Sequence, residues 1–490
     1  MISSEVKNRY KVTIGIECHV QLKTKTKLFS GADNDAREAE PNTLVNHIDF
    51  GLPGALPVLN KQALTLAARA AFALNSSPQL FSKFDRKHYF YPDLPMGYQI
   101  TQYDEPIILG GSIDYEIDGQ PRSVQITRAH LESDAGKSTH ASGKDYSLVD
   151  LNRAGTPLLE IVSEPDMHTS AEAKAYAREL WLNMRYAGVS DANLYYGNMR
   201  FDVNVSVSQN DQLGTRTETK NLNSFRSVEK AVGYEVNRQI ELLEKGDKIV
   251  QETRGWDEAK QKTISQRTKE NADDYRYMPD PDIPPIVLTE AWINEIKRSM
   301  PVLPAQWRHR LQELDLTKPN IETLLEAEIE HESVGYLSLI EEAGKNKEVA
   351  KFMANWFVNL EIPLRSNEEA LTTDFAARHK IYSSAYELTK SGKLSSTNVK
   401  VLLSELLKAQ SLPEDIEKYA ESQGLIQVSD EAEIDKIVSQ VLSENAKAAE
   451  DVKNGEIKAI GFLVGQVMKA SKGKANPGLA TQLIKKQLGV

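Results

Sequence analysis

The sequence predicts an α+β protein: a domain with a mostly antiparallel sheet, then an all-helical domain and a small helical tail domain. Four stretches before residue 290 alternate polar and apolar residues with a period of two, which is the pattern of a strand. Helical stretches are interleaved with them without a repeating βαβ rhythm, which favours an α+β fold. Beyond the proline-rich segment 278–285, strand patterning fades and helical periodicity takes over.

The four alternating stretches, residues 12–22, 128–134, 200–206 and 216–220, each carry ligand-type side chains on one face. These are Glu17, His19 and Gln21; Arg128, His130, Glu132 and Asp134; Arg200, Asp202 and Asn204; and Arg216, Glu218 and Lys220. Acids and imidazoles suit a divalent metal, and cations suit phosphate oxygens. We interpret the four faces as the floor of one polar cleft with nucleotide chemistry. A set of cross-strand salt bridges is the alternative interpretation.

Helical periodicity and proline positions divide the chain into domains 1–290, 291–410 and 411–490, the last boundary lying beside Pro413. The first domain should contain helices at 61–74, 170–187 and 227–243. The second should contain helices at 292–300, 304–314, 320–327, 347–360 and 396–409, and the tail helices at 430–449, 456–470 and 479–488.

Composition is ordinary for a soluble globular protein, with 40% hydrophobic and 26% charged residues in 490, a length that favours two to four domains. We expect a cytoplasmic protein without a membrane segment, because neither a long apolar run nor a signal-like start is visible. The single cysteine, Cys18, excludes an internal disulfide and a cysteine-cluster zinc site. Its place on the apolar face of a strand predicts a small buried residue.

The net charge of −11 argues against wholesale coating of nucleic acid, yet residues 451–490 contain seven lysines and two acids, a local balance of +5. Such a basic end suits phosphate contacts, with a solvated helix face as the alternative. Gly136-Lys137-Ser138 looks like the end of a P-loop, but Leu131 stands where that motif needs its first glycine. A nucleotide, if used, must be bound by another architecture.

Long strings of the chain resemble the B subunit of the tRNA-dependent amidotransferases. They lie at 15–22, 128–132, 150–166, 198–206, 218–225, 274–279 and 461–477, in order over essentially the whole chain. The resemblance implies a heterotrimer with a glutaminase A subunit and a small C subunit, acting on mischarged Glu-tRNA(Gln), Asp-tRNA(Asn) or both. It implies that the B subunit phosphorylates the side-chain carboxylate with ATP and Mg²⁺, in a cradle similar to glutamine synthetase and guanidino kinases. The tail would contact tRNA, with Lys469, Lys472 and Lys474 as candidates.

Within this resemblance the polar faces receive expected roles. Candidate catalytic residues are Glu17, His19, His130, Glu132, Asp202 and Glu218. Candidate metal ligands are Glu17, His19, Glu132 and Glu160, the last from the segment 150–160. Candidate phosphate and substrate contacts are Arg128, Arg153, Arg200, Asn204 and Lys220.

Many members of the family that the chain resembles carry two cysteine pairs, whose places hold Ser30, Ala32, Asn46 and Asp49 in this chain. We therefore expect no structural zinc. No glutaminase nucleophile is visible, so another chain must cleave glutamine. Two other functions remain open: a free-standing ATP-dependent carboxylate–amine ligase, and a non-catalytic tRNA-binding assembly subunit.

Overall fold

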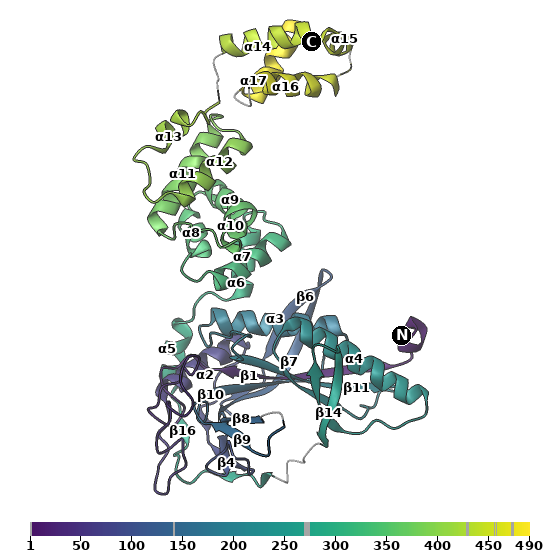
Figure 1. Ribbon diagram of the computed structural model, residues 1–490, viewed down its shortest axis with the longest axis vertical. Coiled ribbons are helices and arrows are strands. Elements are labelled where there is room, and N and C mark those ends of the chain that lie inside the picture. Colours follow the sequence, from purple (N-terminus) through teal and green to yellow (C-terminus); the bar gives the residue numbers. More distant parts are fainter. Residues whose placement is uncertain are drawn as a thin grey trace. The chain divides into compact units, whose positions relative to one another are not determined.

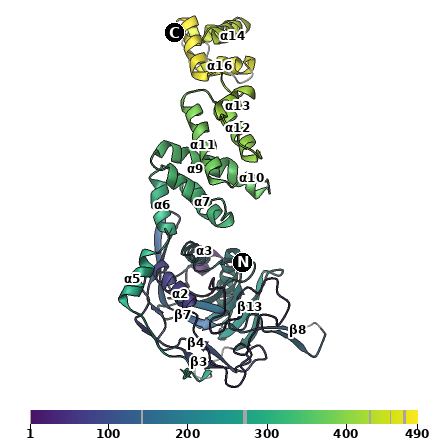
Figure 2. The same ribbon diagram turned by 90° about the vertical axis from the view of Figure 1, so that its left-hand side faces the viewer.

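The computed structural model describes residues 2–140, 143–268, 275–427, 431–454, 456, 458–471 and 475–490. It divides into two compact units, Met1–Pro304 and Ala305–Val490. The first unit contains the sheet and the second is helical (Figures 1 and 2). This confirms the predicted α+β class with a helical second half. The finer division at residues 290 and 410 stays a prediction.

One nine-stranded sheet organises the first unit, in the order β14-β13-β12-β11-β1-β10-β7-β5, with β6 paired to β7. Its strands are β1 (Lys11–Gln21), β5 (Ile108–Leu109), β6 (Ser112–Ile117), β7 (Gln120–Ser133), β10 (Pro157–Ser163), β11 (Met199–Ser208), β12 (Thr217–Leu222), β13 (Glu252–Asp257) and β14 (Lys262–Thr268). All neighbours are antiparallel except β12 and β13, which confirms the mostly antiparallel sheet. The four predicted strands are β1, β7, β11 and β12.

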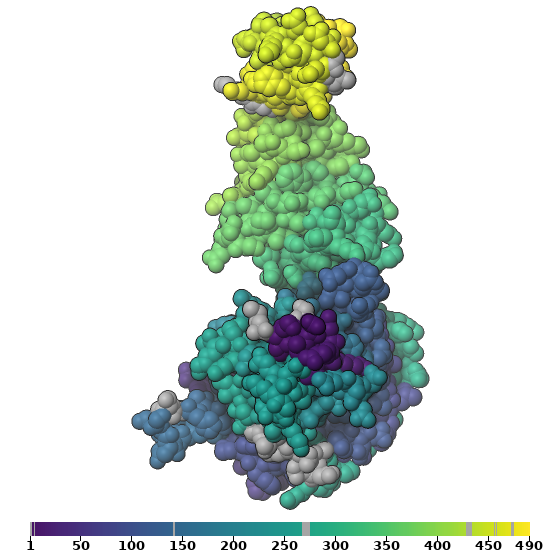
Figure 3. All heavy atoms as spheres, turned by 90° about the vertical axis from the view of Figure 1, so that its right-hand side faces the viewer, coloured from purple at the N-terminus to yellow at the C-terminus, as the bar shows by residue number. Residues whose placement is uncertain are grey.

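Shorter strands surround this sheet. They are β3 (Asp85–His88), β4 (Tyr98–Thr101) and β15 (Met278–Pro279); β2 (Phe81–Ser82) and β16 (Ile286–Val287); and β8 (Lys137–His140) with β9 (Ser147–Asp150). The hairpin of β8 and β9 projects from the unit (Figures 2 and 3). Because Gly136 leads into strand β8, and not into a helix, the rejection of a P-loop is confirmed.

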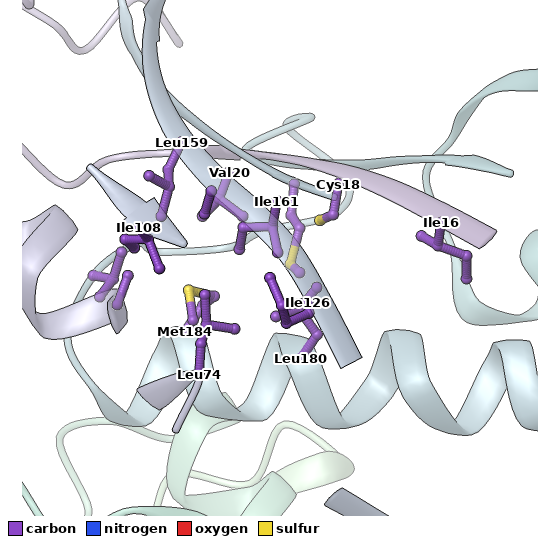
Figure 4. Close-up of a cluster of buried hydrophobic side chains, with 14 of the residues drawn as sticks. Ile16, Cys18, Val20, Leu74, Ile108, Ile126, Leu159, Ile161, Leu180 and Met184 are labelled. Atoms are coloured by element: carbon purple, nitrogen blue, oxygen red, sulfur yellow. The ribbon is translucent and has the colours of Figure 1, made fainter. Parts of the chain in front are cut away.

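Helices cover one face of the large sheet and leave the other face to polar residues. They are α2 (Lys61–Ala73), α3 (Ser170–Tyr186) and α4 (Phe225–Glu244), close to the predicted bounds. Figure 4 shows Cys18 and Ile161 of the sheet facing Leu180 and Met184 of α3, all fully buried. The predicted burial of Cys18 is thus confirmed. Since strand residues alternate, Glu17 and His19 must point away from these helices.

The second unit is built of helices, without a strand among its described residues. They are α6 (Pro304–Gln312), α7 (Lys318–Glu330), α8 (Tyr336–Ala343), α9 (Lys347–Trp356), the π-helical turn η2 (Phe357–Glu361), α10 (Ile362–Ser366), α11 (Phe375–Lys390), α12 (Ser396–Lys408), α13 (Ile416–Ser422), α14 (Glu431–Glu444), α15 (Ala446–Lys453), α16 (Lys458–Ala470) and α17 (Pro477–Leu488). The first unit also contains the short helices α1 (Ser4–Lys7) and α5 (Glu290–Arg298).

Two predicted helices differ from the structure. The single helix expected at 430–449 is wrong: its described part breaks at Asn445, whose ψ of 45° leaves the helical region, into α14 and α15. The helix expected at 347–360 changes from α to π at Phe357. Helices α1, α8, α10, α11 and α13 were not predicted. In α11 the first position of the buried stripe is the charged Arg378, which shortens its apolar part to Ile381, Tyr382, Ala385 and Leu388.

A buried ion cluster stabilises the π turn. Glu361 and Arg378 are both 0% exposed, and the Arg378 Nε lies 3.0 Å from the Glu361 Oε1. Arg365 donates to the same Oε1 over 2.7 Å, and the Tyr382 hydroxyl donates to Oε2 over 2.7 Å. One carboxylate therefore neutralises part of the charge of two guanidinium groups inside the helical unit.

The C-terminal helices α14, α16 and α17 share a hydrophobic cluster of their own, which includes Ile434, Leu463 and Ile484, each 0% exposed. The amphipathic spacing of these residues explains why the segment folds as helices. Across the described parts of the chain, no helix has the length and apolar character needed to cross a membrane.

Candidate functional site

Strand register places four predicted site residues in one row across the polar face of the sheet. On β1, His19 lies opposite Glu160 of β10 and opposite Arg200 of β11. On β10, Glu160 lies opposite His130 of β7. The row therefore reads Arg200, His19, Glu160, His130, and Glu132 follows two residues further along β7. Residues distant in sequence meet here because each occupies the same face of its strand.

The centre of this row is a compact cluster of two carboxylates and two imidazoles: His19, His130, Glu132 and Glu160, which we name the carboxylate–imidazole cluster. The His19 Nε2 lies 3.5 Å from the Glu160 Oε2 and 3.6 Å from the Glu132 Oε1. The His130 Nε2 lies 3.3 Å from Glu160 Oε2 and 3.8 Å from Glu132 Oε2. One ligand atom each of His19, Glu132 and Glu160 fits within 4.8 Å of the others, which suits a divalent cation.

The electrostatics of the cluster fit that cation. Burial disfavours charge, but the hydrogen bonds and negative charges of Glu160 and Glu132 raise the pKa of His19 and of His130 to about 9. Burial also disfavours a charged Glu160, but the two imidazoles hold the pKa of that carboxyl well below its usual range. These shifts favour protonated imidazoles at His19 and His130 beside the carboxylate of Glu160. A bound dication would supply positive charge at the same place and so would replace protons on the imidazoles.

A second charged group lies on β11 and β12. The Lys220 Nζ is 3.1 Å from the Asp202 Oδ2 and 3.3 Å from the Glu218 Oε1. Burial favours the neutral amine, yet these carboxylates raise the pKa of Lys220, whose charge in turn lowers the pKa of the buried Asp202. Glu218 also accepts a hydrogen bond from the Thr253 hydroxyl over 3.0 Å. Lys220 is thereby held as a fixed cation on the polar face.

Glu17 lies between these two groups and outside the set of converging ligand atoms. Its Oε1 accepts a hydrogen bond of 2.9 Å from the Asn204 amide. Burial raises the pKa of Glu17, and the charges of Glu160 and Glu218 raise it further. The structure thus brings together three of the four predicted metal ligands. Direct ligation by Glu17 stays a prediction, and Asn204 contacts an acid of the site.

The predicted phosphate-binding arginines lie at the edge of the same face. Arg153, in the loop before β10, donates a hydrogen bond to Asp134, which immediately follows β7. The Arg200 Nη2 lies 3.8 Å from the other oxygen of Asp134. Arg128 is half-buried opposite Val162, and its buried Nε has no hydrogen-bond partner among the described residues.

One cation of the site was missed from the sequence. Lys87, on the short strand β3, places its Nζ 4.7 Å from the centre of the Tyr275 ring. Burial opposes its charge, but Glu132 and then Tyr277 and Glu160 raise the pKa of Lys87. The sequence signal was the run of three basic residues, Arg86 to His88, in a strand of four residues, which is too short to predict on its own. Tyr275 and Tyr277 come from the segment 273–277, which precedes the proline-rich stretch and which the sequence suggests as a closure of the cleft; residues 273 and 274 lie outside the described ranges.

Three of the four positions where the resemblance implies cysteines, Ser30, Asn46 and Asp49, form part of a hydrogen-bonded cluster. The Ser30 hydroxyl and the Asn46 backbone N–H each donate to the Asp49 Oδ2 over 3.0 Å. The buried Lys27 ammonium lies 3.3 Å from the same oxygen. These side chains are held by hydrogen bonds and an ion pair, and none of them is a thiolate. The expected absence of zinc stays a prediction. In the tail, Lys469 is exposed at the end of α16, while Lys472 and Lys474 lie outside the described residues.

This architecture defines a class of protein: an α+β catalytic domain with a buried carboxylate–imidazole cluster and fixed cations, joined to a helical unit. Residues 12–294 match the family model described as the GatB/GatE catalytic domain, and residues 338–488 match the GatB domain.

Curated relatives cover nearly the whole chain. Proteins of Carboxydothermus hydrogenoformans and Caldicellulosiruptor saccharolyticus are 43% and 44% identical over 98% of this chain and 99% of their own. A protein of Nostoc sp. is 44% identical over 99% of both chains. Each is named as the B subunit of an aspartyl/glutamyl-tRNA(Asn/Gln) amidotransferase. The chain belongs to this family of amidotransferase B subunits, as the resemblance predicted.

Proposed function

We propose that this chain is the subunit of a glutamine-dependent tRNA amidotransferase that activates the side-chain carboxylate of Glu-tRNA(Gln), Asp-tRNA(Asn) or both. It is an ATP-dependent carbon–nitrogen ligase with glutamine as the amide donor, and it works in the cytoplasm. The observation that carries the proposal is the carboxylate–imidazole cluster with fixed cations on either side of it. Binding residues for both a metal and anionic oxygens share one sheet face.

A carboxylate does not react with ammonia, because an oxide would have to leave. Phosphorylation turns that oxygen into a good leaving group, and phosphoryl transfer depends on positioning and on neutralising charge. His19, Glu132 and Glu160 would hold Mg²⁺, with Glu17 adjacent. When bound, this ion neutralises charge on the transferred phosphoryl group. His130 contacts both carboxylates of the cluster and so keeps them in place.

The cations have oriented positions before any substrate arrives. Lys220 is held between Asp202 and Glu218, and Arg153 and Arg200 both approach Asp134. Each pair gives the cation a defined direction across the polar face. Anionic oxygens of ATP or of the substrate would exchange for these carboxylate partners, so little reorganisation of the site is needed.

Ammonia must come from another chain. Cys18 is fully buried in the hydrophobic core, where burial raises the pKa of its thiol well above the usual value, so it cannot serve as a glutaminase nucleophile. We therefore propose a heterotrimer with a glutaminase A subunit and a small C subunit.

Release of phosphate from ATP tests this function in the reconstituted heterotrimer. We expect release to depend on Glu-tRNA(Gln) or Asp-tRNA(Asn), with free glutamate, free aspartate and correctly charged tRNA inactive. We expect this dependence on mischarged tRNA because the side-chain carboxylate of its acyl group accepts the phosphoryl group. Activity with a free amino acid would favour the free-standing ligase. No release with any acceptor would favour a non-catalytic assembly role.

The tail lysines should contribute phosphate contacts to tRNA binding. Changing Lys469, Lys472 and Lys474 together to glutamine should weaken tRNA binding at low salt and leave ATP binding unchanged. Each lost contact should reduce the slope of log affinity against log salt by roughly 0.7–0.9. Titrations at several salt concentrations measure this slope. The control changes the exposed Lys345, Lys347 and Lys400 of the same unit; an equal loss in the control would show that charge alone is responsible.

A further inference from the structure

Two adjacent tyrosines stand out of the loop that joins α3 to β11. Tyr195 is 87% exposed and Tyr196 is 54% exposed. Their ring centroids are 5.2 Å apart with an interplanar angle of 79°, and the Arg37 guanidinium lies 5.8 Å from the centre of the Tyr196 ring. The loop thus presents two aromatic rings to solvent beside the guanidinium of Arg37, which belongs to the segment between β1 and α2 and pairs with Asp35.

The loop holds these rings in fixed positions. The backbone N–H groups of Tyr195 and Tyr196 both donate to the Asn193 Oδ1, over 3.0 and 3.2 Å. Leu194, between them and Asn193, packs against the hydrophobic core. The Trp181 indole of α3 donates to the Ala192 carbonyl over 3.0 Å. The exposure of the tyrosines is therefore built into a loop with many hydrogen bonds.

The same loop is continuous with the candidate site. The Asn198 side chain donates to the Gln21 Oε1 over 2.9 Å, and the Gln21 N–H donates to the Asn198 carbonyl over 2.7 Å. Gln21 shares the polar face of β1 with His19, and Arg200 follows Asn198 by two residues. Tyr196 lies in the turn 194–197, which only Asn198 separates from β11, and Arg200 is the second residue of that strand. The aromatic pair therefore stands at the end of the polar face where Arg153, Arg200 and Asp134 meet.

We propose that Tyr195 and Tyr196 form a stacking platform for the unpaired 3′-terminal nucleotides of the aminoacyl-tRNA. This inference rests on the proposed function, in which the acyl group must reach the polar face. That group is carried by the terminal ribose, so the unpaired bases must lie just outside the cleft. Proteins bind unpaired bases by stacking them on aromatic rings and on arginine planes. The platform offers two tyrosine rings and the neighbouring Arg37 guanidinium for such stacking. Stacking would hold the terminal bases without contacts to the rest of the tRNA.

The test uses the reconstituted heterotrimer with Tyr195→Ala, Tyr196→Ala and the double variant. Loss of a stacked base should raise the KM for mischarged tRNA by about 5- to 150-fold, with kcat and the KM for ATP nearly unchanged. Tyr195→Phe keeps the ring and should retain a KM near that of the wild type. A tRNA with 2-aminopurine at its 3′ end reports stacking directly, because its quenching should be lost in the double variant.

Two results would overturn the platform. The first is a double variant whose KM for tRNA and 2-aminopurine quenching equal those of the wild type. The second is a double variant that no longer assembles with its partner chains but, when forced together at high concentration, binds tRNA normally; the tyrosines would then form a protein interface. A wild-type heterotrimer without tRNA-dependent phosphate release would instead refute the proposed function.

Discussion

Replacing Glu160 by glutamine is expected to lower the rate of ATP-dependent amidation by about 10³-fold, because a charge contribution of several kcal/mol is lost. Both imidazoles of the cluster lie nearer to Glu160, at 3.5 and 3.3 Å, than to Glu132, at 3.6 and 3.8 Å. It is also one of the three converging ligands. Glutamine keeps the shape of the side chain and removes its charge. The loss of rate therefore measures how much the negative charge contributes to metal binding and to pairing with the two imidazoles.

The measurement combines initial rates of amidation with Mn²⁺ affinity from electron paramagnetic resonance, which needs no turnover. The control is Glu164→Gln, at the end of the same strand, where the carboxylate accepts a hydrogen bond from Thr127 and lies outside the cluster. It should keep the wild-type rate and affinity. A Glu160→Gln enzyme with near-normal amidation and Mn²⁺ affinity would refute the metal assignment.

In the helical unit, Glu361→Gln should lower the free energy of unfolding by about 3–5 kcal/mol, since removing one partner of a buried ion pair leaves an uncompensated charge. Here two guanidinium groups, Arg365 and Arg378, would lose their shared carboxylate. Glutamine has nearly the same volume, so packing is conserved and the electrostatic loss dominates.

Hydrogen–deuterium exchange of peptides from α9 to α11, with denaturant unfolding of the full chain, measures this loss within the right unit. Glu342→Gln, an exposed position on α8, is the matched control and should change stability by less than about 0.5 kcal/mol. If Glu361→Gln leaves both exchange and the unfolding midpoint unchanged, the cluster does not stabilise the helices around the π turn.

The candidate site was predictable as far as strand alternation reaches. Glu17 and His19 had to share a face, and the apolar face with Cys18 had to be buried, because the period of a strand is two. Which strands are neighbours depends on long-range pairing, which one sequence does not show. The meeting of His19 with Glu160 and His130 therefore became visible only in the structure. Lys87 was missed for the same reason: its strand lies outside the main sheet.

The helical half shows a different limit. The helices expected at 304–314 and 396–409 were correct to within about two residues, because their apolar stripes are uninterrupted. In α11 a charged residue, Arg378, takes the first position of the buried stripe, so the apolar part of the stripe is shorter. Glu361 could not be assigned to a buried cluster from the sequence, since its partner Arg378 lies on another helix. Helix periodicity predicts faces, but the pairing of buried charges follows from tertiary packing.

The site depends on the register of its strands as well as on the identity of its residues, because Arg200, His19, Glu160 and His130 form one row across three strand pairings. A single inserted or deleted residue within β1 would exchange its two faces, placing Cys18 toward the cleft and His19 in the core. Gene changes of one codon in these strands would therefore be removed by selection even where the altered residue is chemically mild. Variation in length should be confined to the connections, such as the projecting hairpin of β8 and β9.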